Sequence, residues 1–268
     1  MAGDNIASIA LGILKVSHFI VGLMVGALLL SEQGLAAEAP PFRAWWPIVN
    51  QEVEVGGRGF HAFDSDESKD GEQKQKRGFG VGFTDWLFLE LEAIYVRKPG
   101  QNLDLNGYEL GSRIELTETK AFNEAPNLVD VGLLLGISVP DNGADPYEIE
   151  SGLLLYKRAG PWRMTGNLLF EKEFGNSSSG DVETGYAGQV RYRLTPSIQP
   201  GVELFGRFGV LGDISLSEEQ QKVGPGVFGF LEVVEDISLK YELSWLFGYT
   251  SPTPKHSLKW LFEFEYKY

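Results

Sequence analysis

The sequence has 268 residues, with 37 acidic and 23 basic side chains and a formal net charge of −14. Such a negative balance argues against a nucleic-acid partner, because nucleic-acid binding needs a basic surface. There is no cysteine, which excludes disulfide bonds, thiolate metal sites and a lipid-anchoring cysteine. We expect neither a cofactor nor a metal centre.

Residues 1–37 are predicted to be a cleaved secretory signal peptide. Residues 19–30 (FIVGLMVGALLL) form an uncharged apolar run, which Lys15 precedes and small residues follow. A basic residue, an apolar region and a small-residue cleavage site, in that order, are typical of signal peptides. The run is shorter than the ~20 residues of a membrane-spanning helix, and an N-terminal anchor is the alternative. We place the cleavage after Ala36 or Ala37, so that the mature domain covers residues 38–268.

A strict alternation of apolar and polar residues runs through most of the mature sequence. Residues 258–268 (LKWLFEFEYKY) place an aromatic side chain at every second position from Trp260 onward. The same alternation recurs over residues 86–96, 108–117, 188–194 and 237–247. A period of two is the signal of a strand with two chemically opposite faces. On this basis we count about twelve strands, each of roughly 10 to 12 residues.

The links between these strands are alternately short and long. Short links such as residues 159–162 and 195–197 alternate with polar links such as residues 64–76 and 175–181. Only residues 118–128 form a longer link where a short one is expected. Outer-membrane barrels combine strands of ~9–11 residues with short periplasmic turns and long outer loops. We therefore predict an all-β fold, a transmembrane antiparallel up-and-down β-barrel of about 12 strands. A soluble β-sandwich would not require such alternating links.

The aromatic face of the last strand is expected to contact outer-membrane lipid. Lipid replaces the protein core as the partner of this face, while closure of the barrel satisfies the backbone groups. The face consists of Trp260, Phe262, Phe264, Tyr266 and Tyr268. A final strand that ends on an aromatic residue resembles the signal that the outer-membrane assembly machinery recognises. We therefore expect that machinery to be a partner of the chain.

The opposite faces of the strands carry charges of both signs. The candidate pore-lining residues are Arg191, Arg193, Arg207, Glu203, Glu242, Glu263, Glu90, Glu92, Arg113 and Glu115. In one interpretation they line a water-filled pore, in which the three arginines form a patch that attracts anions or organic acids. Glu203, Glu242 and Glu263 would then hold the arginines by pairing. In the other interpretation the charges pair across the interior and plug it. A twelve-stranded barrel is wide enough for either.

His61 and His256 are the only candidates for a catalytic base in the mature chain. A serine hydrolase needs such a base beside its nucleophile, and Ser65 and Ser257 lie near the histidines in sequence. The pattern of the outer-membrane phospholipases, a histidine two residues before its serine, is absent from KHSLKW (residues 255–260). We therefore predict that the protein is not an enzyme. An outer-leaflet lipid hydrolase and a two-histidine metal site are the less favoured alternatives.

For two segments outside the strands, the sequence allows two interpretations each. The acidic residues 64–72 could bind Ca²⁺ or bridge lipopolysaccharide through divalent ions, and the alternative is an ordinary solvated loop. Trp45 and Trp46 could pack inside the barrel as a plug or lie at the periplasmic interface, where tryptophans are enriched. For this pair we favour the interface.

The second half of the chain resembles a family of known outer-membrane proteins. Residues 188–209 (GQVRYRLTPSIQPGVELFGRFG) and 223–268 are similar to bacterial outer-membrane proteins of the meta-pathway phenol-degradation type. The likeness rests on the Arg-Tyr-Arg-Leu, Pro-Gly-Val-Glu-Leu-Phe-Gly, Gly-Pro and Leu-Phe-Gly-Tyr-Thr stretches. Members often carry a histidine just before the Gly-Pro, where this chain has Gln-Lys-Val at residues 221–223. The resemblance implies a barrel with a transporter-like role.

Together these patterns predict a monomeric barrel in the outer membrane of a Gram-negative bacterium. We expect a passive channel or transporter for small hydrophilic or organic solutes, with outer-membrane lipid and lipopolysaccharide as further partners. The alternative is a non-conducting structural or surface-binding barrel with a charge-plugged interior.

Overall fold

The computed structural model describes residues 43–45, 47, 50–117 and 129–268 of the chain. The predicted signal peptide, Trp46 and the long link at residues 118–128 lie outside these residues. Among the residues described, no helix is long and apolar enough to cross a membrane.

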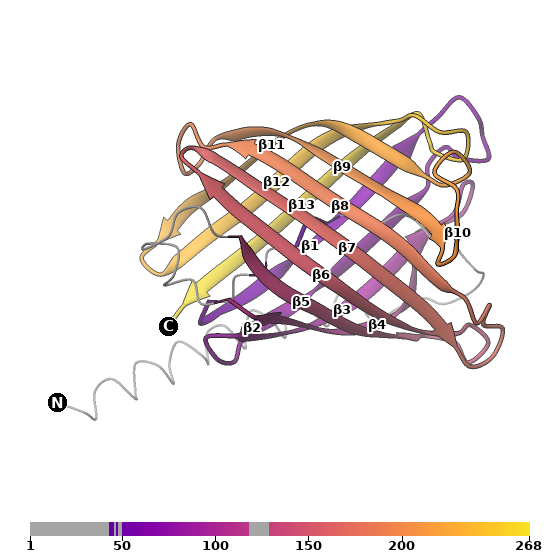
Figure 1. The fold of residues 1–268 in the computed structure, drawn as a ribbon, viewed down its shortest axis with the longest axis horizontal. Coiled ribbons are helices and arrows are strands. Elements are labelled where there is room, and N and C mark those ends of the chain that lie inside the picture. The colour runs from indigo at the N-terminus through magenta and orange to yellow at the C-terminus, as the bar shows by residue number, and fades with distance from the viewer. Residues whose placement is uncertain (1–42, 46, 48–49, 118–128) are drawn as a thin grey trace. The chain divides into compact units, whose positions relative to one another are not determined.

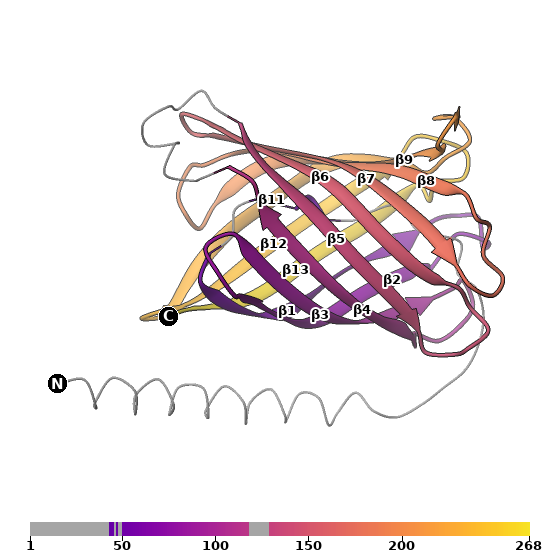
Figure 2. The ribbon, with the colours of Figure 1, turned by 60° about the horizontal axis from the view of Figure 1, so that its bottom comes forward.

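Twelve long antiparallel strands close into a barrel (Figures 1 and 2). They are β1 (Glu52–Phe63), β2 (Gln73–Gly82), β3 (Leu87–Arg97), β4 (Asp104–Glu115), β5 (Asp130–Pro140), β6 (Tyr147–Ala159), β7 (Trp162–Phe174), β8 (Val182–Tyr192), β9 (Gln199–Val210), β11 (Gln221–Val234), β12 (Ile237–Gly248) and β13 (His256–Lys267). A two-residue strand, β10 (Asp213–Ile214), pairs only with the end of β9. Each long strand pairs with the strands before and after it in the chain, β9 with β11, and β13 with β1. The predicted twelve-stranded up-and-down barrel is confirmed.

The pairing of β1 with β13 closes the barrel. It extends over the full length of β1, from Glu52 opposite Lys267 to Phe63 opposite His256. Lipid offers no hydrogen bonds, so an unpaired strand edge inside a membrane would leave a row of unsatisfied backbone groups. The first and last strands supply each other with these partners.

Most links follow the predicted alternation of short and long connections, but the short link at residues 193–198 has six residues, as many as the long links at residues 98–103 and 141–146. The short ones are residues 83–86, 160–161, 193–198 and 235–236. The long ones include residues 64–72, 98–103, 141–146, 175–181 and 249–255. Two of the short links have only two residues, and Gly160 and Asp236 there adopt positive φ values of 58° and 66°. Tight two-residue hairpins require this left-handed conformation, which glycine and aspartate adopt readily.

The two faces of the wall differ as the alternation predicts. On β3, Leu89 and Leu91 are 36% and 41% exposed, whereas Glu90 and Glu92 beside them are 8% and 4% exposed. The apolar side chains therefore point outward and the charged ones point into the lumen. Such an inverted arrangement is stable only where lipid covers the outer face.

At the short-link end, Tyr268 connects the C-terminal end of β13 to β2. Its hydroxyl donates a hydrogen bond of 2.7 Å to the carbonyl oxygen of Gly82, the last residue of β2. This contact reaches from the end of β13 past β1 to the next strand. Phe262, Phe264 and Tyr268 are 41%, 48% and 59% exposed, as expected of a lipid-facing row. Their role as an assembly signal remains a prediction.

We predict that Tyr268→Phe lowers the free energy of unfolding by about 0.5–1.5 kcal/mol, because it removes one hydrogen bond and keeps the ring. The measurement is urea unfolding in lipid vesicles, followed by tryptophan fluorescence. Tyr266→Phe is the matched control, since the Tyr266 hydroxyl has no hydrogen-bond partner in the described part of the chain. Equal stabilities of the two variants would contradict a fastening role for the Tyr268 hydroxyl.

Candidate functional site

The lumen of the barrel holds nine of the ten side chains predicted to line a pore. These nine are between 0% and 9% exposed and belong to the inward faces of six strands. They are Glu90, Glu92, Arg113, Glu115, Arg191, Glu203, Arg207, Glu242 and Glu263. The interior is therefore charged but crowded, and a role of these residues in conduction stays a prediction.

The predicted arginine patch does not form. Arg193 is exposed in the short link after β8, where its backbone N–H donates to the carbonyl of Pro161. On β8, Arg191 lies opposite Gly201, whereas Arg207 of β9 lies opposite Gly185. Six residues of strand separate these two levels, which is about 20 Å. The prediction failed because β8 and β9 are antiparallel, so positions late in one strand are far from positions late in the other.

Lys259 occupies the centre of a fully buried group of polar side chains. Its ammonium lies 2.5 Å from Glu203 and 2.6 Å from Glu242, and the Lys259 and Glu203 side chains have no exposed surface. Gln189 and Ser244 donate further hydrogen bonds to Glu203, of 2.9 and 2.5 Å. Glu203 and Glu242 were predicted to pair with the arginines, and the close ion pairs that they form here are with this lysine.

A second ion-pair network lies on the β13–β1–β3 side of the lumen. Arg58 pairs with Glu90 at 3.0 Å and also with Glu92. Lys240 pairs with Glu263 at 2.9 Å. Removing one partner of a buried ion pair leaves an uncompensated buried charge, which is costly. The network therefore fixes the inner surface on this side.

Arg43 belongs to none of the strands, yet it takes part in this network inside the lumen. It precedes β1 in the chain, yet its guanidinium lies 3.0 Å from Glu263, 3.7 Å from Glu90 and 4.0 Å from Glu54. Arg43 is 5% exposed. The segment before the first strand thus enters the lumen.

Trp45 lies inside the barrel and not at the membrane interface, which corrects the prediction. It is 6% exposed and packs in one cluster with Leu134 of β5, Leu154 of β6 and Leu169 of β7. Asn167 of β7 accepts a 2.6 Å hydrogen bond from the Trp45 backbone N–H and donates one of 3.0 Å to its carbonyl. Both the side chain and the backbone of Trp45 are therefore held by the lumen wall.

Two runs of leucine in the sequence, which break the apolar–polar alternation, indicate where Trp45 packs. Leu133–Leu135 and Leu153–Leu155 are runs of three leucines, so each places one leucine on the inward face. Such an apolar patch in an otherwise polar lumen needs an apolar partner. Trp45 provides it, while the guanidinium groups of Arg43 and Arg58 lie 4.1 and 4.6 Å from its ring centre.

Arg43, Ala44 and Trp45 together extend across the lumen. Arg43 contacts β13 and β1, Ala44 shares an apolar cluster with residues of β8, β9 and β12, and Trp45 contacts β5, β6 and β7. In a ring of twelve strands, β13 and β1 lie opposite β6 and β7. These three residues, the crossing segment, therefore bridge opposite sides of the lumen.

A cavity of about 470 Å³ lies at the long-link end of the lumen. It lies between the β1–β2 link and the ends of β3 to β6. Its charged lining residues include Lys74, Lys98, Glu109, Glu148 and Glu173. Arg207 is held nearby at the outer ends of β7 and β8 by Glu171, at 2.7 Å, and Glu183. This vestibule presents charges of both signs to a solute.

His256 and Ser257 are not arranged as a catalytic pair. His256 lies on the outward face of β13, within 5.9 Å of the Trp245 ring, whereas Ser257 is fully buried on the inward face. Consecutive residues of a strand point to opposite sides, so this pair cannot act together. His61 faces outward as well, and its ring bonds to Gln73.

The acidic loop after β1 is organised by hydrogen bonds within the loop and from the β12–β13 link. Asp64 accepts hydrogen bonds from the N–H groups of Asp66 (3.0 Å) and Lys255 (2.8 Å), which hold the pKa of its carboxyl below the usual range. Asp66 accepts from the Ser68 hydroxyl at 2.7 Å, which lowers its pKa in the same way. Binding of Ca²⁺ or lipopolysaccharide by this loop stays a prediction.

The fold is similar to those of solved outer-membrane proteins. An outer-membrane channel from Pseudomonas putida F1 superposes with a TM-score of 0.55 over 85% of this chain and 99% of that chain, at 14% identity. A bacterial polysaccharide outer-membrane secretin gives 0.40 (10% identity, 82% and 99% covered). The outer-membrane channel DcaP of Acinetobacter baumannii gives 0.35 (9% identity, 80% and 96% covered). No family model and no curated protein matches the sequence.

We predict that Lys259→Met lowers the free energy of unfolding by about 3–5 kcal/mol, because it leaves Glu203 and Glu242 buried without their cation. Urea unfolding in lipid vesicles measures the change. Lys267→Met is the control, since that lysine is exposed near the end of the same strand. If the two variants unfold at the same urea concentration, the buried pair is not a structural requirement.

Proposed function

We propose that this protein is a passive channel for small organic solutes in the outer membrane of a Gram-negative bacterium. The observation that carries the proposal is a lumen with charged walls that contains a vestibule of about 470 Å³ at its long-link end and is crossed by residues 43–45. A polar interior inside a lipid-covered barrel is the arrangement of a solute pathway. The fold shared with an outer-membrane channel supports the same conclusion.

The lining favours solutes that carry both an apolar body and a charged group. Phe60, Phe88, Phe205 and Phe228 are buried on inward faces, beside the charged residues described above. Lys222 illustrates the combination, because its ammonium lies 4.3 Å from the centre of the Phe60 ring. The resemblance of residues 188–209 and 223–268 to the meta-pathway phenol-degradation type also supports organic solutes, and we propose membership of that family.

The aromatic row of β13 is proposed to be the signal for the outer-membrane assembly machinery. Trp260, Phe262, Phe264, Tyr266 and Tyr268 share the outward face, where a partner can reach them before lipid does. We propose that the assembled barrel is a monomer without enzymatic activity. Lipid, including lipopolysaccharide, would then cover its outer wall.

A non-conducting barrel is the second candidate. It is favoured by the extent of ion pairing across the interior, above all the fully buried Lys259 group and the network around Arg43. Conductance separates the two candidates, because a structural barrel passes no current whether or not the crossing segment is held.

We predict that Trp45→Ala raises the single-channel conductance severalfold, because it removes the ring that attaches the crossing segment to β5, β6 and β7. The measurement is the current through refolded protein in a planar bilayer. Trp45→Phe keeps an aromatic ring in the leucine pocket and should conduct like the parent protein. Trp86→Ala, at an exposed position in a short link, is the control for loss of a tryptophan elsewhere.

The parent protein should pass a small, steady current. Silence of both the parent and Trp45→Ala, with folding verified by heat-dependent gel mobility, would reject the channel and support the structural barrel.

A further inference from the structure

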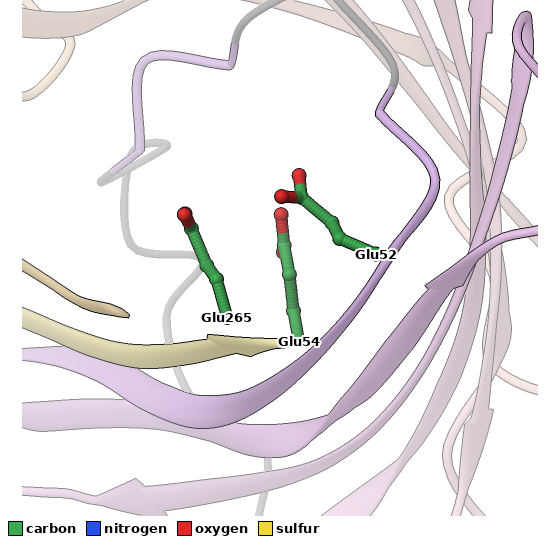
Figure 3. Close-up of side chains that lie close together, drawn as sticks. All are labelled: Glu52, Glu54 and Glu265. Carbon is green, nitrogen blue, oxygen red and sulfur yellow. The ribbon is translucent and has the colours of Figure 1, made fainter. Parts of the chain in front are cut away.

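Three carboxylates meet at the short-link end of the lumen, where the barrel closes (Figure 3). One oxygen of each of Glu52, Glu54 and Glu265 lies within 4.8 Å of the others. These side chains are 4%, 6% and 6% exposed. Glu54 of β1 and Glu265 of β13 are direct cross-strand partners, and Glu52 is the next inward residue of β1. Like charges directly opposite each other destabilise a strand pair unless something neutralises them.

The protein neutralises these carboxylates only in part. Arg113 lies 3.3 Å from Glu54, and Lys240 lies 3.9 Å from Glu265. In the described part of the chain, no cation lies within 4.0 Å of Glu52. Its Oε1 accepts a 3.1 Å hydrogen bond from the Asn50 amide, while its Oε2 is buried and has no hydrogen-bond partner among the residues that the structure describes. A buried carboxylate oxygen in this state is costly and calls for a cation.

The charge balance of the surrounding network points the same way. Its anionic members are Glu52, Glu54, Glu90, Glu92, Glu263 and Glu265. Its cationic members are Arg43, Arg58, Arg113 and Lys240. Six negative charges against four positive leave an excess of two. The two uncompensated negative charges are assigned to Glu52 and Glu265, because the other carboxylates have closer cationic partners.

We propose that Glu52, Glu54 and Glu265 bind one divalent cation, and that the cation is Ca²⁺. All the ligand atoms are oxygens, which hard cations such as Ca²⁺ and Mg²⁺ prefer over softer metals. Calcium binds carboxylate oxygens at about 2.3–2.6 Å, so ligand oxygens on opposite sides of the ion are roughly 4.8 Å apart. Three oxygens that all lie within 4.8 Å of one another can therefore contact a single ion, whose double charge equals the excess of the network.

The ion would join the two strands whose pairing closes the barrel. Two of its ligands come from β1 and one from β13. Glu54 also lies 4.0 Å from Arg43, which connects the site to the crossing segment. Binding would therefore stabilise both the closing strand pair and the start of that segment. This role requires only the barrel and does not depend on whether the lumen conducts.

The test is calcium binding to the full, refolded protein in zwitterionic detergent micelles free of lipopolysaccharide. After chelator treatment, calorimetric titration with CaCl₂ should show one saturable site, and Ca²⁺ should raise the melting temperature Tm. Glu52→Gln and Glu265→Gln should each weaken the affinity at least tenfold and reduce the shift in Tm. Asp66→Asn should leave both unchanged, which separates the lumen site from the acidic loop after β1.

Several results would overturn the proposal. One is the absence of saturable binding by folded protein. Another is unchanged affinity in both Glu→Gln variants, and a third is loss of binding in Asp66→Asn alone. If Ca²⁺ has no effect but the barrel becomes more stable as the pH falls, the carboxylates share protons instead of a metal ion. Because these readouts measure binding and stability, a failed conductance experiment would not affect them.

Discussion

This structure depends on one requirement. The backbone groups of the barrel strands must find all their hydrogen-bond partners in neighbouring strands. A lipid environment offers the strands no partners, so the sheet must close on itself, and β1 must pair with β13. Closure then gives the strands two unlike sides. The apolar face goes to lipid, and charged residues that a soluble protein would keep in water are confined in a lumen.

Confinement explains the interior. Charges in a narrow, poorly hydrated space are stable only when they are paired, and here most belong to networks centred on Lys259, Arg58 and Arg43. The same requirement draws in the chain before β1, because Arg43 supplies a cation to the acidic wall and Trp45 covers the inward leucines on the far side. The crossing segment is therefore part of the folded barrel and takes part in the ion pairing of the lumen.

The sequence predicts the wall far better than the interior. Alternation and link length depend on local order along the chain, which is why the twelve strands and the outward aromatic row of β13 could be read directly. The partners inside the lumen depend on strand direction and on stagger around the ring. Without that information, Arg191 and Arg207 were predicted to lie together. The alternating pattern also did not indicate that Lys259 would form ion pairs with Glu203 and Glu242. The position of Trp45 could have been anticipated only by asking what covers Leu134 and Leu154.

The central claim is that the segment before β1 crosses the lumen, and a disulfide cross-link tests it most directly. The chain contains no cysteine, so a variant with Ala44→Cys and Ala187→Cys has only these two thiols. Both alanines belong to one buried cluster, and a disulfide forms only when the two Cα atoms are about 4.4–6.8 Å apart. The account predicts an intramolecular disulfide on mild oxidation of the folded barrel. Two free thiols that react with maleimide in the folded protein would contradict it.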